Sequence, residues 1–195
     1  MAEGTKIKLR QWTMRDVDVF TYWQQPHHKW HQLDGPYYPK MTTEQVDNLA
    51  AKISEKIKIK EPIPNRYVIA DQTTNEMVGI VTWYWESQET NWLSVGIVIF
   101  DEANWARGFG FEALGLWSQH LFDTMPELVR LDLRTWSGNM GMMKLAKKCG
   151  YKEEARFRMA RIVNGKYFDG MGYGVLRSEW ETLYPEGFGG YLIGA

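Results

Sequence analysis

Residues 94–117 read SVGIVIFDEANWARGFGFEALGLW, an apolar strand followed by a short polar loop, a glycine turn and an amphipathic helix. Glycines at the start of a helix let a ligand approach its first backbone N–H groups closely. The positive end of the helix dipole favours a phosphate at the same place. The stretch therefore predicts a site for a pyrophosphate-bearing cofactor, formed by the backbone N–H groups of Arg107, Gly108, Phe109, Gly110 and Phe111.

A dinucleotide site is one interpretation of this turn. Residues 108–113 satisfy the pattern G-x-G-x-x-G/A, and Asp132 lies about 20 residues further on, where a ribose-binding acid is expected. However, residues 101–107 separate the strand from the first glycine, and the neighbouring segments are mostly strands in hairpins. An NAD-binding oxidoreductase is therefore a distant alternative.

Length and composition favour one well-packed domain. The chain has 195 residues, of which 44% are hydrophobic, which is enough for one core and too few for two large ones. We expect a single domain over residues 1–184. Residues 185–195 form a glycine-rich tail that is expected to be loose or to dock on a partner, such as a second copy in a homodimer.

Charge and cysteine content exclude several classes of protein. The net charge of −1 gives no basic surface for nucleic acid. Cys149 is the single cysteine, so no intramolecular disulfide forms. No apolar run approaches the roughly 18 residues of a membrane span, and the first residues lack a signal-peptide core. We expect a soluble, cytoplasmic protein without nucleic-acid or membrane partners.

Hydrophobic periodicity predicts alternating strands and helices. Thr13, Thr42 or Thr43, and Asn139 are the expected helix caps, and the Asn164-Gly165 pair predicts a hairpin. Residues 25–41 form a long aromatic loop of a kind that often serves binding. The expected strands are 6–12, 66–70, 77–86, 93–100, 128–136, 156–163 and 166–175.

Three motifs together resemble the GNAT superfamily of N-acetyltransferases, in particular its RimJ/RimL-like branch. They are the string WARGFGFEA over residues 105–113, a helix that starts at Asn139 and ends in Cys149-Gly150-Tyr151, and the hairpin around Asn164-Gly165. The resemblance implies a mixed α/β fold of the α+β type, with a largely antiparallel central sheet of about seven strands and flanking helices. It also implies an acetyl-CoA-dependent enzyme in which a primary amine attacks the thioester directly.

The resemblance assigns a cofactor site. The pyrophosphate would bind the glycine turn, and the pantetheine arm would lie where the central strand and its neighbour separate, with Val98, Ile99 and Phe100 opposite residues 132–136. Asn139 would bond the amides of the arm. The alternative for Asn139 is an ordinary helix cap.

At the positions of the catalytic acid and base, the sequence departs from the pattern of the family. Ser94 stands where the family often has a glutamate, and the aligned donor positions of the fourth helix hold Met142 and Ala146, which cannot donate a proton. An ammonium must lose a proton before it attacks, so we expect Glu86 or Glu89 to act through a water held by Ser94. The alternative is that both glutamates are solvated turn residues. A histidine of the aromatic loop, His27, His28 or His31, is another possible base, whereas no metal site is expected.

Aromatic side chains are expected to line the acceptor pocket, because their faces attract a cationic amine. Their alternative role is hydrophobic core. The acceptor is a peptide amino-terminus or a small amine such as a polyamine, an amino acid or an aminated antibiotic. The missing acid and base keep a non-catalytic acyl-CoA binding or sensing module as an alternative. The aromatic candidates are Trp30, Tyr37, Tyr38, Trp83 and Trp85.

Overall fold

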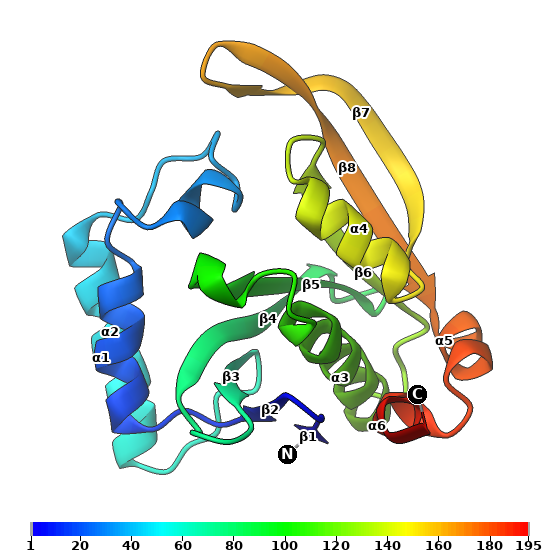
Figure 1. The fold of residues 1–195 in the computed structure, drawn as a ribbon, viewed down its shortest axis with the longest axis horizontal. Coiled ribbons are helices and arrows are strands. Elements are labelled where there is room, and N and C mark those ends of the chain that lie inside the picture. The colour runs from blue at the N-terminus through cyan, green and yellow to red at the C-terminus, as the bar shows by residue number, and fades with distance from the viewer. Residues whose placement is uncertain (1, 195) are drawn as a thin grey trace.

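A computed structural model describes residues 2–194 and contains one eight-stranded sheet, shown in Figure 1. The strand order across the sheet is β1-β2-β3-β4-β5-β6-β8-β7. The strands are β1 (Ala2–Glu3), β2 (Ile7–Arg10), β3 (Arg66–Asp71), β4 (Met77–Ser87), β5 (Trp92–Ile99), β6 (Arg130–Trp136), β7 (Lys152–Val163) and β8 (Lys166–Leu176).

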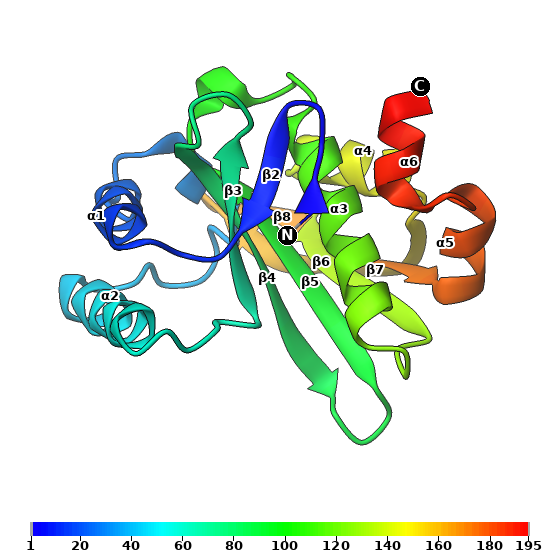
Figure 2. The same cartoon turned by 90° about the horizontal axis from the view of Figure 1, so that it is seen from below.

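Helices cover both faces of the sheet, as Figure 2 shows. α1 and α2 pack on one face, while α3 and α6 lie on the other. The helices are α1 (Met14–Trp23), α2 (Thr43–Lys58), α3 (Phe109–Thr124), α4 (Met140–Lys148), α5 (Arg177–Leu183) and α6 (Gly187–Gly194), with short 3-10 turns η1 (Lys29–Gln32) and η2 (Glu102–Asn104). Among residues 2–194, none of these helices has the length and apolar character needed to cross a membrane.

Every neighbouring pair of strands is antiparallel except β5 and β6. These two run parallel and pair only at Leu93 with Leu131 and at Ser94 with Asp132. Beyond those residues the two strands separate. The expected mixed, mostly antiparallel sheet is confirmed, with the two-residue β1 added to the seven strands expected.

Local signals set the helix boundaries as expected. Thr13 caps α1 in a reciprocal capping box with Asp16, and Thr42 caps α2. Asn139 caps α4 by accepting from the backbone N–H of Met142 at 3.0 Å. The chain leaves α4 through Gly150, whose φ of +90° is a conformation that glycine adopts without strain.

Residues Gly187–Gly194 form the helix α6, which packs on the same chain and is not a loose tail. Docking of this segment on a partner stays a prediction. Phe188 is fully buried against Trp180 and Gly115. A Cβ at position 115 would lie 2.0 Å from the ring of Phe188, so this close approach requires glycine. α6 therefore completes the core behind α3.

Cys149 lies at the end of α4 and is fully buried. Its Sγ is 3.8 Å from the backbone oxygen of Phe111. Burial raises the pKa of the Cys149 thiol to about 12. The thiol therefore behaves as a small apolar group of the core.

Candidate functional site

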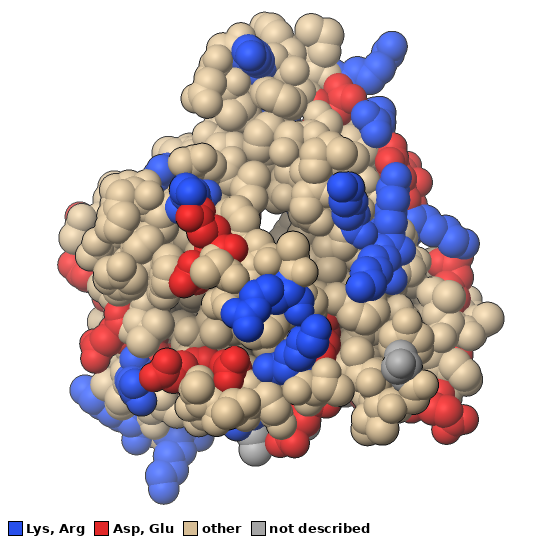
Figure 3. All heavy atoms as spheres, viewed as in Figure 1, with Lys and Arg blue, Asp and Glu red and all other residues tan. Residues whose placement is uncertain are grey.

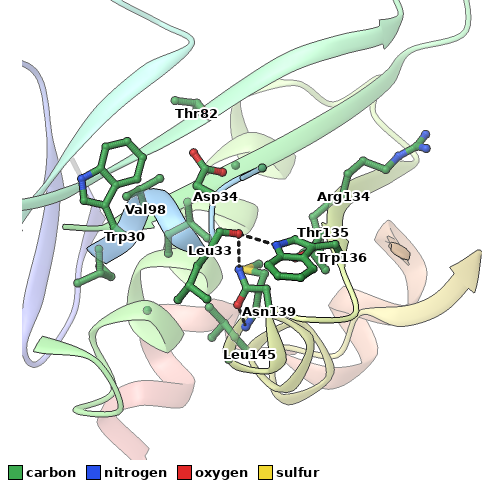
Figure 4. A pocket seen from close by; sticks show the side chains of 18 of the residues that line it. Trp30, Leu33, Asp34, Thr82, Val98, Arg134, Thr135, Trp136, Asn139 and Leu145 are labelled. Atoms are coloured by element: carbon green, nitrogen blue, oxygen red, sulfur yellow. Dashed lines mark hydrogen bonds between the residues drawn. The ribbon is translucent and has the colours of Figure 1, made fainter. Parts of the chain in front are cut away.

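One large cavity, about 1150 Å³, lies where β5 and β6 separate. The loop after α1, Leu49 of α2, the turn before α3, α4 and part of the β7–β8 hairpin form its other walls. Figure 4 shows side chains from these separate segments converging on it. The cavity therefore connects the turn at the start of α3 with the face of the sheet that carries α1 and α2.

The turn before α3 has an unusual backbone. Ala106 and Gly108 both have positive φ angles, +57° and +92°, with Arg107 between them. Such alternation makes a concave nest of backbone N–H groups that binds anions. The first N–H groups of α3 also lack partners within the helix. Ala106, Gly108 and Gly110 line the cavity, so the nest opens into it.

Lysine and arginine side chains gather around the hollow on the face shown in Figure 3. Lys6 donates to the backbone oxygen of Arg107 at 2.9 Å. On the other side of the turn, Nζ of Lys148 lies 4.4 Å from the centre of the Phe111 ring. These cations add positive charge beside the nest, which favours a phosphate group there.

The loop after α1 is tied to the far wall of the cavity by one carbonyl group. The backbone oxygen of Leu33 accepts from Nε1 of Trp136 at 2.8 Å and from Nδ2 of Asn139 at 3.2 Å. Trp136 ends β6 and Asn139 begins α4. The tether holds the next residue, Asp34, between Val98 of β5 and residues 134–136 of β6 (Figure 4).

The carboxylate of Asp34 projects into the cavity and forms no hydrogen bond or ion pair within residues 2–194. Asp34 is exposed to solvent, and the walls of the cavity lie around it. This partial desolvation raises the pKa of Asp34 above its ordinary value. A carboxylate of this kind is suited to accept a proton from a bound group.

Glu86 is a second carboxylate of the cavity wall. It accepts from the hydroxyl of Tyr84 at 3.2 Å and lies 3.5 Å from the guanidinium of Arg134. Glu86 is therefore already partnered, in contrast to Asp34.

A family model for the acetyltransferase (GNAT) domain matches residues 6–152. This match spans most of the chain and includes the nest, the separated strands and α4. The chain belongs to the GNAT acetyltransferases. It is an acetyltransferase of this type, and acetyl-CoA is its co-substrate.

Solved structures share this GNAT fold at low identity. An acetyltransferase from Bacillus anthracis aligns with a TM-score of 0.72 and 15% identity over 91% of this chain and 98% of its own. A spermidine N-acetyltransferase from Vibrio cholerae in complex with CoA and spermine aligns with a TM-score of 0.69 and 18% identity over 89% and 97%. RimL, a ribosomal L7/L12 alpha-N-protein acetyltransferase in complex with coenzyme A, aligns with a TM-score of 0.68 and 19% identity over 88% of this chain and 94% of its own. No curated protein sequence matches the chain.

The residues of this GNAT domain fit acetyl-CoA. The nest at Ala106 and Gly108 supplies N–H groups for a pyrophosphate, and Gly110 keeps the approach to α3 narrow but open. The separated edges of β5 and β6 leave backbone groups available for the amides of an extended arm. When bound, acetyl-CoA supplies the activated acetyl group.

The residues expected to hold acetyl-CoA divide into three groups. Gly108, Gly110, Phe111, Val98 and Ile99 line the cavity. Arg107 and Phe109 lie outside it and line a smaller recess with Lys6. Phe100 does not line the cavity, because its ring is buried among Phe20, Trp23 and Trp30; a contact of its backbone with the cofactor stays a prediction.

Asn139 lines the cavity and is also a helix cap. Both ends of its side-chain amide are engaged, with the oxygen on Met142 and the nitrogen on Leu33. The cap interpretation therefore describes what this structure shows. A bond from Asn139 to the cofactor stays a prediction.

Of the three residues expected to form the base arrangement, one lines the cavity and two do not. Glu89 accepts from Ser87 at 3.0 Å in an exposed turn outside the cavity. Ser94 is fully buried below the cavity wall, and its Oγ has no partner in the described part of the chain. Proton transfer from the acceptor to Glu86 through a water held by Ser94 stays a prediction. Of the expected catalytic residues, Glu86 alone lines the cavity.

The two tryptophans of β4 point away from the cavity. Trp83 and Trp85 do share a face of the strand, but that face packs on the core beneath α3. Thr82 and Tyr84, which lie on the other face of the strand, line the cavity instead. Trp83 and Trp85 are therefore wrong as acceptor-site residues, whereas Trp30, Tyr37 and Tyr38 do line the cavity.

Asp34 and Arg66 are cavity residues that the sequence did not reveal. Asp34 precedes Gly35 and Pro36, so turn chemistry alone explains an aspartate there. Arg66 begins a strand, where a polar residue is ordinary. Among the loop histidines, only His31 lines the cavity, and no group of three metal-ligating side chains occurs within the described chain.

We predict that Gly108→Ala raises the Kd for acetyl-CoA about tenfold, because a side chain at a φ of +92° strains the nest. Isothermal titration calorimetry measures this change. Gly165→Ala is the matched control, since Gly165 also has a positive φ but lies in the hairpin turn with open space around it. Equal affinities of the two variants would contradict the assignment of the nest.

Proposed function

We propose that this enzyme transfers the acetyl group of acetyl-CoA to a primary amine that enters the cavity from the side of Tyr37 and Tyr38. Asp34 takes a proton from the ammonium form of the acceptor. The free amine then attacks the thioester carbonyl, and a carbon–nitrogen bond forms as the carbon–sulfur bond breaks and its electron pair leaves with the sulfur. The attacking nitrogen loses its second proton, which the departing thiolate takes up to give the thiol of coenzyme A. The observation that carries the proposal is the unpartnered carboxylate of Asp34 between β5 and β6.

The charges of the cavity argue against a polyamine acceptor. Two carboxylates line it, Asp34 and Glu86, against six cations. A polycation gains little from such a wall, whereas a single ammonium needs only one carboxylate. We therefore favour an amino acid or a peptide amino-terminus over a spermidine-like amine. The six cations are Lys40, Arg66, Arg134, Lys144, Lys148 and Arg161.

Thiol release from acetyl-CoA tests the proposed function. Purified enzyme is mixed with acetyl-CoA and with each member of a panel of amino acids, short peptides and polyamines. Thiol release that depends on an amino acid or a peptide supports the proposal. Tight binding of acetyl-CoA without release for any amine would contradict it and favour a non-catalytic acyl-CoA binding module.

A further inference from the structure

Arg66 is a cation of the cavity wall that has no carboxylate partner among the residues the structure describes. It lines the cavity at the start of β3, and its side chain is partly buried. Within residues 2–194 its guanidinium forms no ion pair, hydrogen bond or cation–π contact. Because no carboxylate compensates its burial, desolvation lowers the pKa of Arg66 from its ordinary value.

The other two arginines of the wall are engaged. Arg134 lies beside Glu86, and Arg161 lies over the rings of Tyr37 and Tyr38 at 4.5 and 5.7 Å. Arg66 is thus the arginine of the wall whose guanidinium N–H groups are all available to bind an anion. A guanidinium binds a carboxylate through two parallel hydrogen bonds.

The strand register places Arg66 away from the phosphate nest. Arg66 pairs with Thr82, and Thr82 pairs with Gly96 of β5. The nest follows the end of β5, beyond Ile99, which is three residues further along that strand. At about 3.4 Å per residue and 4.8 Å per strand, Arg66 lies about 10 Å further along the sheet and two strands across. The phosphates of acetyl-CoA therefore do not account for it.

From the unpaired guanidinium of Arg66 on the acceptor side of the cavity, we infer that the acceptor amine carries a carboxylate, which Arg66 binds. This inference rests on the proposed function and narrows it. Asp34 receives the ammonium group and Arg66 the anionic group of the same molecule. An amino acid or a short peptide with a free carboxyl end carries both groups.

The test compares glycylglycine with glycylglycine amide, which differ in the carboxylate alone. With acetyl-CoA saturating, kcat/KM for glycylglycine is expected to exceed that for the amide by about 10- to 100-fold. Arg66→Gln is expected to remove the difference, chiefly by raising KM for glycylglycine, and Arg66→Lys to retain part of it. Arg158→Gln is the control, because Arg158 is an exposed arginine outside the cavity.

The outcomes separate the role of Arg66 from the proposed acetyl transfer itself. Equal rates for peptide and amide, or an equal loss for both in Arg66→Gln, would overturn the role of Arg66 and leave the acetyl transfer intact. Absence of thiol release with every acceptor would instead overturn the proposed function. In that case calorimetric titration of glycylglycine into the CoA-loaded protein still measures whether anion binding depends on Arg66.

Discussion

Asp34→Asn is expected to lower kcat/KM for amine acetylation by about 10²- to 10⁴-fold while Kd for acetyl-CoA stays unchanged. The amide keeps the shape of the side chain but cannot accept the proton of the acceptor. Wild-type kcat/KM is expected to fall at acid pH as Asp34 becomes protonated, with an apparent pKa above the ordinary value of an aspartate. This limb of the pH profile is expected to be absent in the variant.

Asp34→Asn is also expected to change the stability of the folded protein, and the direction of the change follows from the raised pKa of Asp34. Because folding raises the pKa of Asp34, the folded state binds more protons than the unfolded state between the two pKa values. Stability therefore falls as pH rises through that interval, and at neutral pH the charge is destabilising. Asp34→Asn should keep or raise the Tm, so a loss of activity is not a loss of fold. Glu89→Gln, in the exposed turn, is the control, and equal activities of the two variants would contradict the role of Asp34.

Glu112→Ala is expected to reduce the free energy of unfolding by about 3–5 kcal/mol. Glu112 is buried in the first turn of α3 and accepts three hydrogen bonds, from the hydroxyl of Thr5 at 2.5 Å and from the backbone N–H groups of Lys6 at 2.8 Å and Ile7 at 3.2 Å. Removal of the carboxylate leaves these donors, which lie just before β2 and at its first residue, without their partner. Urea denaturation followed by circular dichroism measures the change.

Glu44→Ala is the matched control for this experiment. Glu44 also lies in the first turn of a helix, α2, but it is exposed. Its loss is expected to cost at most about 1 kcal/mol, the amount that the helix dipole accounts for. If Glu112→Ala costs no more than Glu44→Ala, the dipole alone explains Glu112 and its link to the first strands is unimportant.

The elements of the fold could be predicted because their signals are local. The Thr13 cap, the Asn164-Gly165 turn and the glycines before α3 each depend on a few adjacent residues. The tail after residue 184 could not be predicted in this way. Its helix depends on Phe188 reaching Gly115, a contact across more than 70 residues of sequence that no periodicity encodes.

The parts of the site that follow from backbone conformation could be predicted from the sequence. The parts that depend on which face of a strand lines the cavity could not. Alternation showed that Trp83 and Trp85 share a face, but the choice between that face and the face of Tyr84 is made by the packing of α3. Asp34 was not predictable because it reaches the cavity through the tether of Leu33 to Trp136 and Asn139.

The inert state of Cys149 has a practical consequence for the assays above. A thiol with a pKa of about 12 is ionised in roughly one molecule in 10⁵ at pH 7, and only the thiolate reacts with disulfide reagents. A colorimetric thiol reagent added to the native enzyme therefore reports released coenzyme A with no background from the protein. Reaction of one thiol per chain in the absence of acetyl-CoA signals unfolding, so the same reagent checks the integrity of each variant.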